Sequence, residues 1–202
     1  MTKLRTLSGA YDWRAEKIEW PVTTDVGPGL AGVVAAETRV MWLDPSSGQL
    51  AYRGVPIEEL ASPADFEETA HLLITGRTPE EDPGGLADFR KNVRASRTLP
   101  ADVVELVRSL DPATHPTRAL RAGVSAVGCH ELTADDDLAG ERQWRELRVV
   151  GQVASLVGEI CRHRQGLARR PTEDGCSLAE GVLRDLNDRM PEPEEVRALD
   201  LL

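Results

Sequence analysis

The feature that most constrains the fold is a series of helix start signals that runs from Pro56 toward the end of the chain. Each signal is a capping residue followed directly by proline or, three residues later, by glutamate. The signals lie at Ser62-Pro63, Asp82-Pro83, His115-Pro116 and Ser177 to Glu180. Apolar residues follow at intervals of three and four, the period of an amphipathic helix. The sequence therefore predicts successive helices of about three turns, joined by short polar turns.

The apolar stripes also predict which face of each early helix points inward. The inward residues are Phe66, Ala70, Leu73 and Ile74 in a helix that starts at Pro63 and ends at Gly76; Leu86, Phe89 and Val93 in the second; and Val103, Leu106, Val107 and Leu110 in the third, which starts at Pro100. Paired acids such as Glu67-Glu68 diverge by about 100° on a helix, so we interpret them as solvated surface.

One stretch before Pro56 departs from the helical pattern. Residues 33–43 are β-rich at both ends, a turn signal occupies 44–48, and a second strand pattern follows over 49–53. These residues predict one short β-hairpin in a region 27–55, ahead of a helical region 56–202. Residues 1–26 show no sustained period and predict an arm that either packs on another surface or is disordered. The predicted fold class is mainly α, with one short N-terminal β-hairpin.

Charge and composition exclude several classes of partner. The 202 residues carry 24 lysines and arginines against 34 aspartates and glutamates, and the net charge of −10 repels nucleic acid and anionic membranes. No stretch approaches the roughly 18 uncharged apolar residues of a membrane span. Three cysteines form an odd, sparse set that is typical of a reducing compartment. We therefore expect a soluble, cytoplasmic protein with reduced cysteines.

The predicted helix that begins at Pro116 is unusual because its repeating positions are small. These positions are Ala119, Ala122, Gly123 and Ala126. A glycine within a helix costs about 1 kcal/mol relative to alanine, so we expect close packing against another helix to offset that cost. The other helix belongs either to the same chain or to a second subunit. The longest predicted helix, 141–164, has apolar flanks broad enough for burial on more than one side, with Gly166 as its C-cap.

No motif predicts a catalytic, cofactor or metal site. Residues 27–32 match the glycine spacing of a dinucleotide-binding loop, but an arm precedes them and a strand follows, so we interpret them as a turn. Cys129-His130 and the pair Cys161 and His163 lack the spacing of a tetrahedral zinc site. His115 is interpreted as a structural residue at a helix start. The residues by themselves indicate a helical scaffold without a visible catalytic constellation.

Several segments, taken together, resemble the citrate synthase family. The most specific are Gly29–Thr38, which reads GLAGVVAAET, and Leu50–Leu60, which reads LAYRGVPIEEL. The helix containing residues 66–73 and the His115-Pro116 helix follow in the family's order, with Thr117 where methionine is usual. The resemblance extends over residues 27–202 and leaves only the arm unmatched. It implies a portion of the family's multi-helical large domain.

The family resemblance also carries expectations about function. Citrate synthases are mostly α-helical homodimers that condense acetyl-CoA with oxaloacetate to citrate and CoA by acid–base chemistry, without a metal. In the family, the catalytic histidines, the aspartate and the substrate arginines follow the stretch that matches residues 197–202. We therefore expect this chain to stop before them and to be inactive alone. The choice between acetyl-CoA and propionyl-CoA stays open.

The expected partners follow from the same resemblance. Ala119, Ala122, Gly123 and Ala126 are expected at the interface of a homodimer, and a complementary C-terminal chain is the other expected partner. Oxaloacetate and acyl-CoA would bind only to a complete enzyme. The alternatives are one subunit of a split citrate synthase, or a non-catalytic helical module for dimerisation or regulation.

Overall fold

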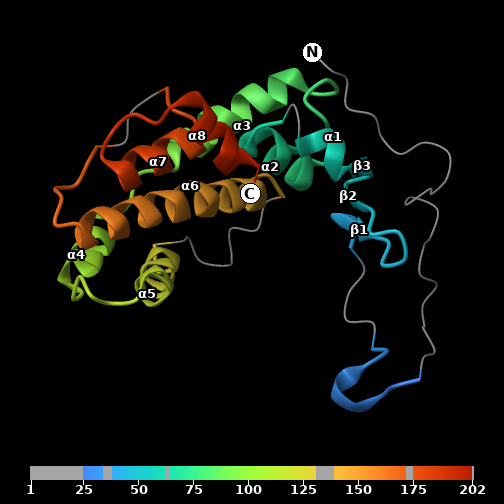
Figure 1. The fold of residues 1–202 in the computed structure, drawn as a ribbon, viewed down its shortest axis with the longest axis horizontal. Coiled ribbons are helices and arrows are strands. Elements are labelled where there is room, and N and C mark those ends of the chain that lie inside the picture. The colour runs from blue at the N-terminus through green and yellow to red at the C-terminus, as the bar shows by residue number, and fades with distance from the viewer. Residues whose placement is uncertain (1–24, 34–37, 62–63, 131–138, 172–174, 202) are drawn as a thin grey trace. The chain divides into compact units, whose positions relative to one another are not determined.

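A computed structural model describes residues 25–33, 38–61, 64–130, 139–171 and 175–201, with the backbone alone described at 139–146. The predicted arm lies outside the described residues except for its last two positions. The chain forms two compact units. The first comprises residues up to Ala64 together with Thr69–Glu81, and the second comprises Asp65–Glu68 together with Asp82–Leu202. The predicted class, mainly helical with a small N-terminal sheet, is confirmed (Figure 1).

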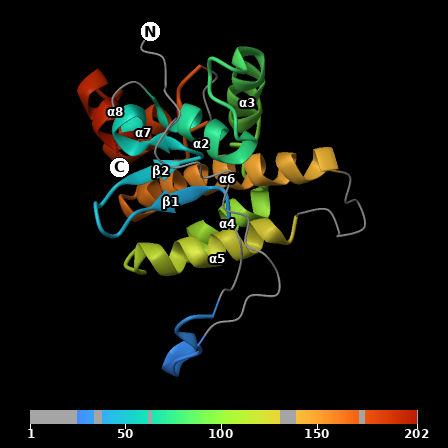
Figure 2. The same ribbon diagram turned by 90° about the vertical axis from the view of Figure 1, so that its right-hand side faces the viewer.

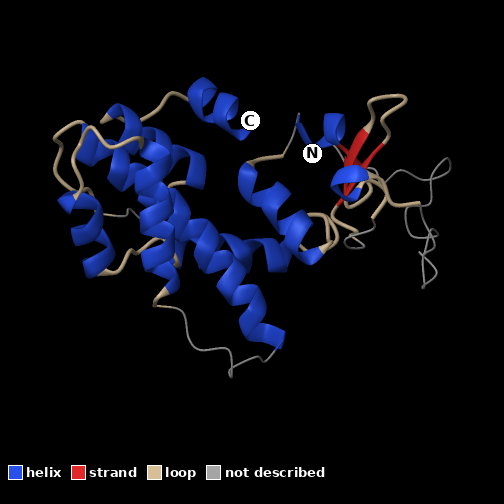
Figure 3. Cartoon of the chain, turned by 90° about the horizontal axis from the view of Figure 1, so that it is seen from below, coloured by secondary structure: helices blue, strands red, loops and turns tan. Residues whose placement is uncertain are grey.

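The first unit holds the three described strands, which form one antiparallel sheet (Figure 3). β1 (Met41–Leu43) pairs with β2 (Leu50–Tyr52), which confirms the predicted hairpin. A third strand, β3 (Val55–Pro56), was not predicted and pairs with the other edge of β2. The two residues between β2 and β3 both have positive φ, 52° at Arg53 and 83° at Gly54, as a tight hairpin turn requires.

A small apolar cluster holds the first unit together. It consists of Val55, Leu60, Ala64 and Leu72, packed with the half-buried Tyr52 and Ile57. The contributing helices are α1 (Ile57–Ala61) and the later turns of α2 (Phe66–Thr75), while the 3₁₀ turn η1 (Pro28–Leu30) precedes the sheet. Arg53 ties the hairpin turn to α2 because its Nη2 donates to the Leu73 carbonyl at 2.7 Å. The unit therefore has a core of its own.

The predicted capping signals at Asp82, His115 and Ser177 begin helices of the second unit, and the signal at Ser62 is the exception. The helices are α3 (Pro83–Ala95), α4 (Ala101–Ser109), α5 (Pro116–Gly128), α6 (Ala139–Arg164), α7 (Leu178–Asn187) and α8 (Pro193–Asp200). Asp82 accepts a hydrogen bond from Gly85 N at 2.9 Å, and His115 Nδ1 accepts one from Thr117 N at 3.3 Å. Ser177 and Glu180 form the predicted reciprocal capping box.

The exception is α2, which begins at Phe66 and not at Pro63. Asp65 and Glu68 form the capping pair: Asp65 Oδ1 accepts from Glu68 N at 2.8 Å, and Glu68 Oε2 accepts from Asp65 N at 3.2 Å. The sequence offers two capping residues three positions apart, Ser62 and Asp65, and only one of them can start the helix. Two predicted inward residues are exposed, Phe66 of α2 and Leu106 of α4, which corrects the prediction. The buried apolar residues of these helices include Leu72 of α2 and Val104 of α4.

α6 is the centre of the second unit. Figures 1 and 2 both place α5 on one side of α6 and α7 with α8 on the opposite side. The main core lies between α4, α5 and α6 and consists of Leu99, Val103, Val104, Val107, Ala119, Val127, Leu156 and Ile160. α3 and α7 contact other faces of α6, which confirms its predicted burial on more than one side. Gly166, with φ 71°, ends α6 as predicted.

Glycines bring the helices of this unit close to α6. A Cβ at Gly123 of α5 would lie 2.8 Å from Leu156 Cδ2, closer than side chains tolerate. A Cβ at Gly151 of α6 would lie 2.1 Å from Ser96 Oγ, at the end of α3. The expected close packing of the small-faced helix is therefore present inside this chain, between α5 and α6.

Candidate interaction site

The second unit contains an apolar groove of about 550 Å³. The start of α2 and the helices α6, α7 and α8 line it. Its lining residues are Phe66, Val149, Val150, Val153, Ala154, Val157, Leu178, Ala179, Val182, Leu199 and Asp200. All of them are aliphatic or aromatic except Asp200, so the groove offers a nearly continuous hydrocarbon surface. A surface of this kind is a mark of an interaction site rather than of ordinary solvated protein.

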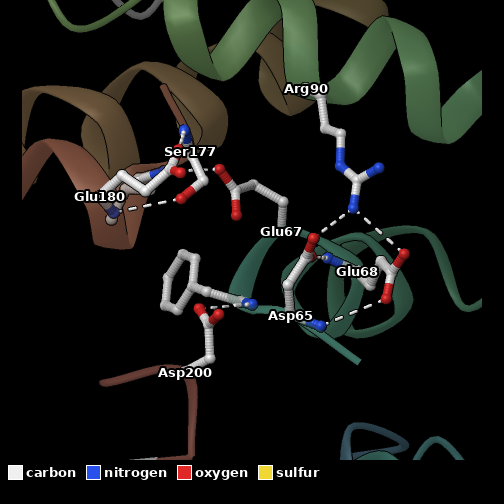
Figure 4. A network of polar contacts seen from close by, with 9 residues as sticks. Asp65, Glu67, Glu68, Arg90, Ser177, Glu180 and Asp200 are labelled. Carbon is white, nitrogen blue, oxygen red and sulfur yellow. Dashed lines mark hydrogen bonds and ion pairs between the residues drawn. The ribbon is translucent and has the colours of Figure 1, made fainter. Parts of the chain in front are cut away.

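Asp200, at the end of α8, joins that helix to the start of α2. Its Oδ1 accepts a hydrogen bond from Phe66 N at 3.3 Å, as Figure 4 shows. Burial raises the pKa of the Asp200 carboxyl above its usual value, and the nearby carboxylates of Asp65 and Glu180 raise it further. The hydrogen bond from Phe66 and the positive charge of Arg197 oppose this shift by lowering the pKa. This edge of the groove is therefore acidic.

Glu67 lies next to the groove and holds the start of α7. Its Oε1 accepts a hydrogen bond from Leu178 N at 2.7 Å, and only 4% of the residue is exposed (Figure 4). Its other oxygen, Oε2, is buried and has no hydrogen-bond partner in the described part of the chain. Burial raises the pKa of this carboxyl, although the bond from Leu178 opposes the shift. A carboxylate at the first turn of α7 also meets the positive end of the helix dipole.

Arg97 supports the same helix start from the other side. Its guanidinium donates to the carbonyl oxygens of Cys176 at 3.1 Å, Ser177 at 2.8 Å and Leu178 at 3.3 Å. Burial lowers the pKa of Arg97, and the negative charge of Glu67 opposes this shift. The first turn of α7, which forms one wall of the groove, is therefore fixed by two buried ionisable side chains from α2 and the end of α3.

A third ionic contact fixes the N-terminus of α2 to α3. Arg90 Nη2 forms ion pairs with Asp65 and with Glu68, the second at 3.1 Å, as Figure 4 shows. The same two carboxylates form the capping pair of α2. The groove wall contributed by Phe66 is thus held in place by capping and by charge pairing.

Two of these features were missed by the sequence analysis. Glu67 was interpreted as solvated surface, which is wrong, because burial depends on α7, more than a hundred residues further along the chain. The groove was also missed, although the apolar flanks of the 141–164 helix were the signal that could have revealed it. Val149 and Val153 are among those flanking residues, and they line the groove.

The structure places the four small residues predicted at a dimer interface on α5. Ala119 and Gly123 are buried, and Ala122 and Ala126 are half-buried. Gly123 faces Leu156 of the same chain. Part of the small face is therefore used for packing within the second unit, while its role at a subunit interface stays a prediction.

The described side chains also show the surroundings of the histidines and cysteines that were considered as possible site residues. No group of three or more histidine, cysteine, aspartate or glutamate residues that could hold a metal ion occurs among them. His163 Nε2 lies 2.8 Å from the Leu110 carbonyl, His130 Nε2 lies 2.9 Å from Asp102, and His115 is a helix cap. Cys129, Cys161 and Cys176 are free thiols. Within the described ranges, no helix is long and apolar enough to cross a membrane.

The helical architecture around α6, with its apolar groove, defines a scaffold of packed helices rather than a self-contained ligand pocket. Comparison with known proteins assigns this scaffold to a protein family. The sequence model of the family described as "Citrate synthase, C-terminal domain" matches residues 29–202. This chain belongs to the citrate synthase family, as the resemblance predicted.

Characterised relatives agree with this assignment. Citrate synthase of Mycolicibacterium smegmatis is 33% identical over 172 residues, which cover 85% of this chain and 45% of that protein. The 2-methylcitrate synthase of Mycobacterium tuberculosis is 30% identical over 176 residues, or 87% of this chain and 44% of that protein. The chain thus spans about half the length of the curated relatives it matches.

Solved structures show the same fold. Citrate synthase of Thermoplasma acidophilum, in a ternary complex with carboxymethyl coenzyme A and oxaloacetate, matches with a TM-score of 0.79 at 24% identity, over 89% of this chain and 46% of that one. Citrate synthase of Pyrobaculum aerophilum matches with a TM-score of 0.73 at 27% identity, over 92% of this chain and 49% of that one.

Proposed function

We propose that this chain is the scaffold and dimerisation half of a citrate synthase-type enzyme. The reaction of the complete enzyme would be the condensation of an acyl-CoA, acetyl-CoA or propionyl-CoA, with oxaloacetate. The observation that carries the proposal is the family match over residues 29–202 combined with coverage of about half of each relative. Both citrate and 2-methylcitrate synthases occur among those relatives, so both acyl groups belong to the proposal.

The polar groups of this half support a structural role. The Arg97 guanidinium and one oxygen of Glu67 bind the backbone of the first turn of α7, and Arg90 holds the capping carboxylates of α2. His163 binds a backbone carbonyl oxygen. These side chains are committed to holding helices in position, so the acid–base groups of the reaction would come from polypeptide that corresponds to the rest of the relatives' length.

The proposal extends to assembly and compartment. We infer a homodimer formed through α5, supported by the half-buried Ala122 and Ala126, and a cytoplasmic location, supported by three free thiols.

The decisive measurement is release of free CoA from acetyl-CoA and oxaloacetate, followed with a thiol reagent after correction for the protein's own cysteines. The purified 202-residue chain is expected to release none above background. Addition of the second half of a relative, co-expressed with the chain, is expected to produce turnover. Sustained turnover by the chain alone would show that the catalytic groups lie within it and would refute the proposal.

A further inference from the structure

We infer that the apolar groove between α6, α7, α8 and the start of α2 is the docking site for the polypeptide that supplies the second half of the citrate synthase fold. This inference rests on the proposed function and names the partner of this scaffold. The expected partner surface is aliphatic, with one basic or hydrogen-bond-donating group at the Asp200 end. Four observations on the groove carry the inference.

The first observation is the chemistry of the lining. Ten of the eleven lining residues are apolar, and the remaining one is Asp200. A coenzyme A derivative carries phosphates and oxaloacetate carries carboxylates, and a groove whose lining holds one carboxylate and no cation offers neither of them a partner. The groove is therefore suited to hydrocarbon side chains of another polypeptide segment rather than to the substrates.

The second observation is the incomplete cover over α8. None of its residues is buried, although Val196 and Leu199 are apolar and half-buried. α7 packs on α8 from one side, and Leu199 lines the groove on another. A helix with an apolar stripe normally buries that stripe against a second element.

The third observation is the amount of polypeptide that relatives possess beyond the matched half. This chain covers 46% of the Thermoplasma acidophilum structure, so more than half of that fold has no counterpart in it. A scaffold that matches this well, with a TM-score of 0.79, is expected to retain the surface on which the remainder packs.

The fourth observation argues against a second copy of this chain as the occupant. A two-fold symmetric contact centred on the groove would bring the Asp200 edge close to its own equivalent, and the charges of Asp65 and Glu180 next to Asp200 outnumber that of Arg197 there. Like charges placed together at an interface disfavour the complex. The proposed homodimer uses α5 and leaves the groove free.

A binding experiment with a matched control tests the inference. The probe is the second half of the Mycolicibacterium smegmatis citrate synthase, co-expressed with this chain. Val149 lines the groove and Val124 lies on α5 outside it, and both are 39% exposed valines within helices. Val149→Glu would bury an unpaired charge in the contact and should weaken association at least about tenfold. Val124→Glu should bind the probe as the wild type does.

A thiol footprint gives a second, independent readout. Val153 lines the groove, so Val153→Cys should react with a maleimide in the chain alone and become at least about tenfold less reactive in the complex. Cys129, which is exposed at the end of α5, provides an internal reference whose labelling the probe should not change. Peptide-level mass spectrometry separates the two labels from those of Cys161 and Cys176.

The outcomes separate this inference from the proposed function. Weakening by Val149→Glu alone, with protection of the cysteine at 153, supports the inference. The probe could instead restore turnover while Val149→Glu binds it normally and the cysteine at 153 stays reactive. That result overturns the groove assignment and leaves the proposed function standing. If that cysteine becomes protected in the chain alone as the protein concentration rises, a second copy is the occupant, and the inference about the groove is overturned as well. Absence of both binding and turnover refutes the proposed function and the inference together.

Discussion

Replacement of Gly151 by alanine should destabilise the second unit, because α3 approaches α6 at this residue. The added Cβ would lie 2.1 Å from Ser96 Oγ and 2.7 Å from the Val93 carbonyl oxygen. Ser96 Oγ donates to the carbonyls of Val93 at 2.7 Å and Leu147 at 3.2 Å, so rotating it away would sacrifice these contacts. The Val93 oxygen belongs to the backbone of a buried residue, and it can move only if the end of α3 moves.

The magnitude follows from opposing contributions. Overpacking costs roughly 1–3 kcal/mol, and loss of the Ser96 hydrogen bonding adds about 1 kcal/mol. Alanine is the better helix former by about 1 kcal/mol, which acts in the opposite direction. The expected net loss in the free energy of unfolding is therefore about 1–3 kcal/mol for Gly151→Ala.

Urea denaturation followed by circular dichroism at 222 nm measures this change. Gly84→Ala is the control, because Gly84 lies in α3 and a Cβ there would have no neighbour within 4 Å. The control should be neutral or more stable by up to about 1 kcal/mol. If Gly151→Ala proved as stable as Gly84→Ala, the close approach of α3 to α6 would not exist and the reasoning would be refuted.

Three further predictions concern charge, assembly and a strained cap. Glu67→Gln keeps an acceptor for the start of α7 and removes a carboxyl whose pKa is raised by burial. Because a raised pKa means that the folded state binds the proton more tightly, the stability of the wild type relative to Glu67→Gln should increase as pH falls from 7 toward the usual glutamate range. Urea denaturation at a series of pH values measures this difference. A relative stability that instead falls over this range would contradict the burial of Glu67. Ala122→Glu should convert the proposed homodimer to monomer in light scattering with unchanged helicity, and an unchanged mass would exclude α5 as the interface. Asp188, at φ 53°, pairs with the buried Arg162 at 2.7 Å. Asp188→Ala should therefore lower the free energy of unfolding, and Asp188→Asn should lower it less, because asparagine tolerates the left-handed backbone and keeps an acceptor for Arg162. Thermal and urea denaturation measure both changes, and equal losses would contradict this reasoning.

Local features were predicted well because their interactions join residues close in sequence. The caps Asp82, His115 and Ser177 lie within three residues of the amides they bind, and all three begin helices as predicted. The strand pairing of β1 with β2 was also predictable, since a short turn joins them. The choice between the caps at Ser62 and Asp65 was predicted wrongly. Ion pairs from Arg90 to Asp65 and Glu68 add to the second cap, and they come from a different helix.

The candidate site was much less predictable. The apolar surface of α6 was visible in the sequence, but not which part of it stays open. Val149, Val153, Leu156 and Ile160 follow one another at intervals of four, three and four residues, so they share one stripe of the helix. Leu156 and Ile160 are buried in the core, whereas Val149 and Val153 line the groove. No local pattern distinguishes the two parts of the stripe, because the difference depends on where α5, α7 and α8 pack.

The sequence by itself determined the helical class, most helix starts and, through the resemblance, the family. These follow from hydrogen bonds within one turn and from the order of recognisable segments. Only the tertiary structure decided that Glu67 is buried, that the small face of α5 packs on Leu156, and that one side of α6 stays open as a groove. The physical reason is that burial is a property of contacts between helices far apart in the chain, and these contacts exist only after the helices have packed.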